Sequence, residues 1–156
     1  MAKETVSVSE INQQAPVVGW SEIEIDAAPD VAWDVLTAIG RWPSWNPAVK
    51  SVSFEEGIEE GSEFRWKAGP GAITSTIREV EPLRRIVWTG TTFGIKAIHV
   101  HTLEPRAGGT LVRTEESYDG LVARVLHRRL QKTLDDALEN ELRHLKAEAE
   151  RRERKG

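Results

Sequence analysis

The C-terminal third of the chain alternates apolar and charged positions with the period of a helix, from Leu121 to about Arg152. Because steps of four residues overshoot a 3.6-residue turn by about 40°, the apolar band on this helix is wide. A wide band suits a helix that lies in the curve of a twisted sheet better than a helix in a coiled coil, which needs a narrow seam. We expect Asp119 to cap the helix. The apolar positions are Val122, Leu126, Leu130, Leu134, Ala137, Leu138 and Leu145.

The residues before this helix carry the two-residue alternation of β-strands. Residues 17–26 predict one strand, and Pro29 and Gly40 bound a short helix with an apolar stripe. Two prolines and two tryptophans within residues 42–47 predict a stiff loop or a single helical turn. Six further strands are expected at about 49–56, 62–68, 72–81, 84–91, 95–104 and 110–118.

These elements predict an α+β fold, in which a curved sheet of seven antiparallel strands wraps around the long C-terminal helix and two short helices follow the first strand. Short links between successive strands favour the antiparallel pairing. We expect one domain over residues 17–146, a flexible N-terminal arm over 1–16 and a charged, fraying tail over 147–156. A chain of 156 residues can bury about two-thirds of its unfolded surface, so its core needs no disulfide or metal.

The composition argues against several classes of protein. The chain has no cysteine, which removes disulfide frameworks, thiol catalysis and cysteine-based zinc sites. A formal net charge of −4 argues against nucleic-acid binding. No segment approaches the roughly 20 apolar residues of a membrane span, and the N-terminus lacks the apolar stretch of a signal peptide. We therefore expect a cytoplasmic protein, monomeric or homodimeric, that is not integral to a membrane.

Six tryptophans stand beside one tyrosine and three phenylalanines, which is more indole than a core of this size needs. By alternation Phe64 and Trp66 share one face of their strand, and Trp88 lies on one face of a later strand together with Ile86. If these faces are concave, Trp66 and Trp88 line a space for a ligand. The alternative is that they are ordinary core residues.

Two histidines lie on one face of the strand predicted at 95–104. The following turn permits a register that places His99 opposite Glu116 and His101 opposite Thr114. Inside a cavity these groups would form a polar patch able to orient a ligand or shuttle a proton, whereas on the convex face they would be a solvated pair. A carboxylate alone in an apolar cavity would have a raised pKa, and one beside a protonated histidine would be held ionised. Metal binding would need a third ligand, so we expect no metal site.

Several stretches of the sequence resemble a known family. Together with the order of elements they resemble the START-like (SRPBCC) superfamily, which has a helix-grip fold, and within it the bacterial polyketide cyclase/dehydrase-like branch. The resemblance implies a cavity between sheet and long helix that holds a hydrophobic small molecule or lipid, with Trp45 near its mouth. No cofactor is expected. The stretches are residues 25–36 (IDAAPDVAWDVL), 42–47 (WPSWNP), 81–88 (EPLRRIVW), 103–105 (LEP) and 108–110 (GGT).

This resemblance leaves three functions open. The first is binding or transport of a hydrophobic, aromatic or polycyclic molecule. The alternative is an enzyme of the polyketide cyclase/aromatase or dehydratase type. Relatives of that type tend to place arginine and tyrosine in the cavity, whereas here Arg65 lies on the face opposite Trp66, and Tyr118, the one tyrosine, lies at a strand end. A protein-interaction module resembling a co-chaperone shares the same fold and is the third.

The candidate site combines the strand residues on the expected concave face with two leucines from the apolar band of the helix. Among these residues, His99, His101 and Glu116 are the candidates for catalysis. The full ligand-binding set is Trp45, Phe64, Trp66, Ile77, Trp88, His99, His101, Thr114, Glu116, Leu126 and Leu130.

Overall fold

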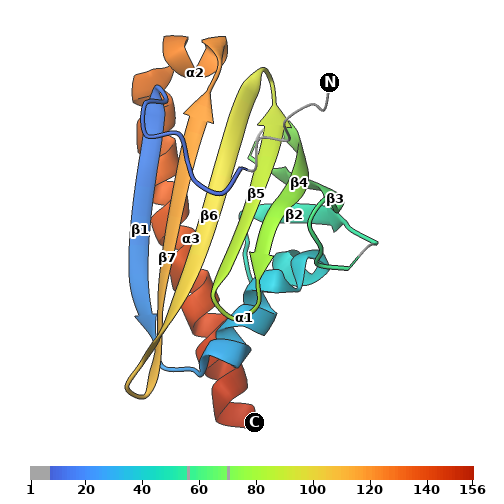
Figure 1. The fold of residues 1–156 in the computed structure, drawn as a ribbon, viewed down its shortest axis with the longest axis vertical. Coiled ribbons are helices and arrows are strands. Elements are labelled where there is room, and N and C mark those ends of the chain that lie inside the picture. Colours follow the sequence, from blue (N-terminus) through green and yellow to red (C-terminus); the bar gives the residue numbers. More distant parts are fainter. Residues whose placement is uncertain (1–7, 56, 70) are drawn as a thin grey trace, which may run out of the picture.

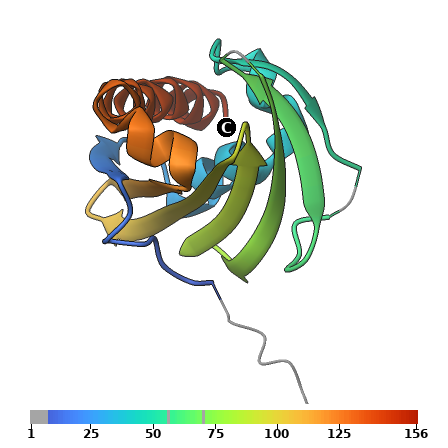
Figure 2. The same ribbon diagram turned by 90° about the horizontal axis from the view of Figure 1, so that it is seen from above.

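A computed structural model describes residues 8–55, 57–69 and 71–156. Within these ranges seven strands form one antiparallel sheet in the order β1-β7-β6-β5-β4-β3-β2, and the sheet curves around the long helix α3 (Figures 1 and 2). This confirms the predicted helix-grip architecture. The strands are β1 (Val17–Ile25), β2 (Val49–Ser53), β3 (Glu63–Ala68), β4 (Gly71–Glu81), β5 (Arg85–Thr92), β6 (Ile95–Arg106) and β7 (Gly109–Asp119).

Two short helices connect β1 to β2, as expected. Helix α1 (Pro29–Thr37) begins at a proline, which suits the first turn because its nitrogen needs no partner there. A 3₁₀ helix (Ile39–Ser44) then carries the chain through Gly40, where we expected the helix to end. The indole N–H of Trp42 donates to the Leu36 carbonyl at 2.9 Å, and this bond fixes the tryptophan against the end of α1.

The central strands are covered on both faces. Val87 and Val100 are buried on the convex side, where Ile11 packs against them. The backbone N–H of Asn12 donates to the Ser117 hydroxyl at 3.1 Å, which holds the same segment on β7. We expected a flexible arm over residues 1–16, of which 1–7 lie outside the described residues. In the described part of the arm, Ile11 is buried against the sheet, whereas residues 12–14 are exposed.

The predicted C-terminal helix is broken at Leu126. Helix α2 (Leu121–Val125) and helix α3 (His127–Lys155) lie at an angle to each other (Figure 2). Gly120, not Asp119, is the N-cap of α2, and it has φ 107°, a conformation that favours glycine. A β-carbon on Gly120 would lie 2.4 Å from the carbonyl oxygen of Gly94, so the close approach of two turns fixes where the helix begins.

The other end of α3 also differs from expectation. The helix continues to Lys155, where we expected a fraying tail from residue 147. Ala149 is fully buried, and the Glu150 carboxylate accepts the backbone N–H of Asp26 at 3.1 Å. A small side chain and a polar contact therefore hold the last turns in place, although no large apolar residue follows Leu145.

Two hydrophobic clusters fill the space between the sheet and the helices. One contains Trp42, Trp88 and Leu142, and the other contains Leu134 and Leu138. Residues of both clusters line the cavity described below. Within the described residues, no helix is both long enough and apolar enough to cross a membrane.

Candidate functional site

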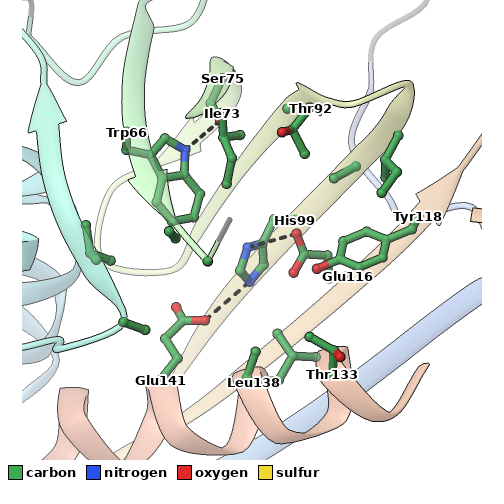
Figure 3. A pocket seen from close by; sticks show the side chains of 18 of the residues that line it. Trp66, Ile73, Ser75, Thr92, His99, Glu116, Tyr118, Thr133, Leu138 and Glu141 are labelled. Carbon is green, nitrogen blue, oxygen red and sulfur yellow. Dashed lines mark hydrogen bonds and ion pairs between the residues drawn. The ribbon is translucent and has the colours of Figure 1, made fainter. Parts of the chain in front are cut away.

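A cavity of about 410 Å³ lies between the concave face of the sheet and α3 (Figure 3). Its volume falls within the range of about 300–1,000 Å³ that is usual for small-molecule pockets. Most of its wall is apolar. The larger apolar side chains that line it are Trp42, Trp45, Trp66, Ile73, Trp88, Phe93, Ile95, Leu130 and Leu138.

The tryptophans of this wall support one another. The ring centroid of Trp42 lies 5.4 Å from those of both Trp66 and Trp88. The indole N–H of Trp66 donates to the Ser75 hydroxyl at 3.0 Å. The indole nitrogen of Trp45 is buried and has no hydrogen-bond partner among the described residues. A buried N–H without an acceptor costs about 1–3 kcal/mol, so this nitrogen is an unsatisfied donor on a side chain of the cavity wall.

A polar patch interrupts the apolar wall on β6 and β7. The register places His99 opposite Glu116 and His101 opposite Thr114, as the sequence predicted. The Nδ1 atom of His99 lies 3.6 Å from a Glu116 oxygen, and its Nε2 atom lies 2.7 Å from the Thr114 hydroxyl. These residues lie on the concave side, so the alternative of a solvated pair on the convex face is wrong.

The helix contributes a second carboxylate to this patch. Glu141 projects from α3 toward His99 (Figure 3), and its carboxylate also contacts His101. Its Oε1 atom lies 2.6 Å from Nε2 of His101, and its Oε2 atom lies 3.6 Å from Nε2 of His99. The two imidazoles lie beside each other with ring centroids 4.3 Å apart. His99 therefore lies between two carboxylates, one on β7 and one on α3.

The two carboxylates have opposite electrostatic environments. Burial, and secondly the charge of Glu141, raises the pKa of Glu116 well above its ordinary value. Burial acts on Glu141 in the same direction, but the electrostatic effects of the neighbouring His101 and His99 and the hydrogen bond from His101 outweigh it, so the pKa of Glu141 is lowered. Glu116 is thus an acid that keeps its proton, and Glu141 is a carboxylate that stays ionised.

His99 and Tyr118, which lie beside these carboxylates, are both uncharged at neutral pH. Burial and the neighbouring His101 lower the pKa of His99 to about 3, although Glu141 acts in the opposite direction. His99 is therefore neutral at pH 7, and of the two cases that the sequence left open for Glu116 the raised pKa applies, not the carboxylate held ionised by a protonated histidine. The neighbouring Glu116, followed by burial, raises the pKa of Tyr118, so the tyrosine hydroxyl also remains protonated.

Comparison with known proteins identifies the family. A family model described as "Polyketide cyclase / dehydrase and lipid transport" matches residues 20–150. The chain belongs to this family. A comparison with curated proteins finds no match.

Three solved structures illustrate what this polyketide cyclase/dehydrase family member resembles in fold. Hypothetical protein jhp0584 from Helicobacter pylori has a TM-score of 0.79 at 14% identity, over 89% of this chain and 91% of that chain. A START superfamily protein from Mycobacterium smegmatis has a TM-score of 0.75 at 15% identity, over 86% and 97%. The di-domain ARO/CYC StfQ from the steffimycin biosynthetic pathway has a TM-score of 0.74 at 18% identity, over 87% of this chain and 52% of that chain. The START-like resemblance is confirmed, and at these identities the likeness is one of fold.

The structure places the predicted site residues of this family member in three groups. Six of them line the cavity, namely Trp45, Trp66, Trp88, His99, Glu116 and Leu130. Four others are buried beside or behind that lining: Phe64, Ile77, His101 and Thr114. Leu126 does not belong to the site, because the break between α2 and α3 leaves it 44% exposed. The Trp20 ring is exposed and lies 4.3 Å from the Arg113 guanidinium carbon.

Glu141 and Tyr118 are the titratable lining residues that sequence analysis missed. Tyr118 lies on the concave face of β7, two residues after Glu116, although its position at a strand end suggested otherwise. Glu141 had a signal in the sequence. It lies four residues after Ala137 and four before Leu145, so it interrupts the apolar band of the helix with a charge. A charged residue on a face predicted to be buried is a candidate for function.

Proposed function

We propose that this protein binds a hydrophobic, aromatic or polycyclic small molecule that carries an oxygen substituent. The observation that carries the proposal is the cavity of about 410 Å³, whose apolar wall is broken by one polar patch at His99, Glu116 and Glu141. Pockets that combine much apolar surface with a few convergent polar groups are the usual sites for small molecules. The family description, which includes lipid transport, supports the same class of ligand.

The rings of such a ligand would contact Trp66 and Trp88, and Leu130 would cover them from α3. The protonated carboxyl of Glu116 offers a donor to a carbonyl oxygen of the ligand. The unpartnered N–H of Trp45 offers another. Each hydrogen bond that satisfies a buried group contributes about 1 kcal/mol.

The test is isothermal titration calorimetry with two probes of matched shape, acetylnaphthalene and ethylnaphthalene. Both should bind, and the ketone should bind about tenfold more tightly, because one hydrogen bond of about 1.4 kcal/mol corresponds to a factor of ten. Trp88→Ala should weaken both probes. Trp20→Ala is the matched control, since Trp20 is exposed on the outer surface and should leave both affinities unchanged. Failure of the wild-type protein to bind either probe would count against the proposal.

A second candidate function, catalysis of the cyclase or dehydratase type, is favoured by the opposite pKa shifts of the two carboxylates. In such a reaction the Glu141 carboxylate would take a proton from the carbon beside a ligand carbonyl. The Glu116 carboxyl would give its proton to the oxygen that becomes a hydroxyl or leaves as water. His99, 3.6 Å from each carboxylate, could return the proton from Glu141 to Glu116 and restore both groups.

Dehydration of a β-hydroxy ketone, the aldol of acetone and benzaldehyde, provides a test because the conjugated product absorbs in the ultraviolet. Glu141→Gln should lower the rate by about 100-fold or more while binding of acetylnaphthalene persists. Binding without turnover by the wild-type protein would favour the carrier function over the enzyme.

A further inference from the structure

We infer that His99, His101 and Glu141 form a binding site for a divalent transition-metal cation that opens into the cavity. This goes beyond the proposed function, since an apolar molecule can bind in the cavity without any cation. The sequence had offered two histidines and lacked a third ligand. The fold supplies it, because α3 brings Glu141 to within 2.6 Å of His101.

The three residues are close enough together to coordinate one metal ion. Each offers one ligand atom, and the three atoms lie within 4.8 Å of one another. His99 and His101 occupy alternate positions on β6, so both imidazoles project from the concave face with ring centroids 4.3 Å apart. Glu141 reaches both imidazoles from α3, on the other side of the cavity from His99 in Figure 3. A cation held there would join the sheet to the helix that it grips.

The donor set indicates the kind of metal. Two imidazole nitrogens and one carboxylate oxygen suit Zn²⁺, Co²⁺, Ni²⁺ or Fe²⁺, whereas Mg²⁺ and Ca²⁺ prefer oxygen ligands. Three protein ligands leave at least one position open, as in zinc sites that act on substrates. His99 and Glu141 both line the cavity, so the open position would face the ligand. An oxygen of the ligand, from a carbonyl or a phenolate, could occupy it.

The surroundings of the three residues fit a cation. The Glu116 carboxyl lies 3.6 Å from Nδ1 of His99, which is the arrangement of a carboxylate behind a metal-bound imidazole. Nδ1 of His101 is buried without a partner among the described residues. On metal binding the Nε2 atom of His101 must give up the proton that it shares with Glu141, and Nδ1 is free to take that proton. A dication would also balance the charge of the ionised Glu141 carboxylate in an apolar cavity.

The experiment is titration of the full-length protein, first stripped with a chelator, with Co²⁺ alone. We expect one equivalent to bind with the intense visible absorption of a low-coordinate cobalt site, and Zn²⁺ to displace it. His99→Gln and His101→Gln should each weaken binding by about 100-fold, and Glu116→Gln by about 10-fold. His127→Gln is the matched control, because His127 is exposed at the start of α3. Circular dichroism melting shows whether each variant folds.

A second measurement locates the cation in the wild-type protein. Cu²⁺ should quench Trp88 fluorescence and broaden the imidazole signals of His99 and His101, because the Trp88 ring lies 4.9 and 5.0 Å from these two rings. The signals of His127 should persist at one equivalent. Absence of cobalt binding, or equal affinity in His99→Gln and His127→Gln, overturns the proposal, as does broadening of His127 in place of the two buried histidines.

Discussion

Nε2 of His101 and Oε1 of Glu141 lie 2.6 Å apart, although 40 residues separate them in the sequence. This contact joins the middle of β6 to the middle of α3 across the edge of the cavity. His101 is fully buried, so the carboxylate is its partner in a region that excludes water. The pair thus links the sheet to α3, and its carboxylate forms part of the polar wall of the cavity.

Removing one partner of this pair should lower the free energy of unfolding. His101→Leu leaves the Glu141 carboxylate without its shortest contact in an apolar setting, and breaking a buried pair in this way costs about 3–5 kcal/mol. The double variant His101→Leu with Glu141→Leu should recover much of that loss, since no unpaired charge remains. Urea unfolding of the wild type and both variants measures this. A single variant as stable as the wild type would show that the contact does not form.

The buried state of His99 predicts acid sensitivity in the chelator-treated protein. Its folded pKa of about 3 lies below the unfolded value of 6.5, so its contribution to stability is complete above pH 6.5 and is lost as the pH falls toward 3. The slope reaches about 1.4 kcal/mol per pH unit. The groups that face His99 are His101 on β6, Glu116 on β7 and Glu141 on α3.

The two carboxylates contribute with opposite signs. The lowered pKa of Glu141 adds stability that is lost only as the pH falls below the ordinary carboxyl range, whereas the raised pKa of Glu116 adds stability that is lost as the pH rises. Between pH 6.5 and 4.5 the loss on acidification is therefore due to His99, and Glu116 opposes it. His99→Gln should flatten the fall in the free energy of unfolding over this interval. A fall as steep as that of the wild type would contradict the buried, neutral imidazole.

The core contact of α3 gives a prediction for the fold. Leu142 is almost fully buried in the cluster that contains Trp42 and Trp88, so Leu142→Ala should lower the free energy of unfolding by about 2–5 kcal/mol. Leu121→Ala is its control, because Leu121 is 75% exposed on α2 and should change stability by less than about 0.5 kcal/mol. Equal effects of the two changes would mean that α3 packs on the sheet through another face.

The faces of the strands and one register were predictable from the sequence because alternation has a period of two. As a direct consequence, the side chains on the concave face could be identified, among them Trp66, Trp88 and His99. The pairing of His99 with Glu116 follows from the short turn between β6 and β7. The break at Leu126 was not predictable, since the apolar period runs through it without a proline or glycine. The start of α2 was equally hidden, because it is fixed by the close approach of Gly120 to Gly94, which are distant in sequence.

That approach can be tested by substitution. Gly120 combines φ 107° with a β-carbon position 2.4 Å from a backbone oxygen, so Gly120→Ala should destabilise the start of α2 and lower the melting temperature. Gly40→Ala is the control, because nothing lies within 4 Å of its β-carbon position. If the two variants have the same melting temperature, the turn at Gly120 is not constrained as described.

The central claim, that the cavity takes an aromatic molecule with an oxygen substituent, is tested most directly by the indole N–H signals of the six tryptophans during titration with acetylnaphthalene. We predict saturable shifts for the cavity residues Trp45, Trp66 and Trp88, with a downfield shift of Trp45 as its unpartnered N–H meets the ketone oxygen. The signal of Trp20, on the outer surface, should not move. Unchanged signals for the cavity tryptophans at saturating probe, or a shift confined to Trp20, would contradict the claim.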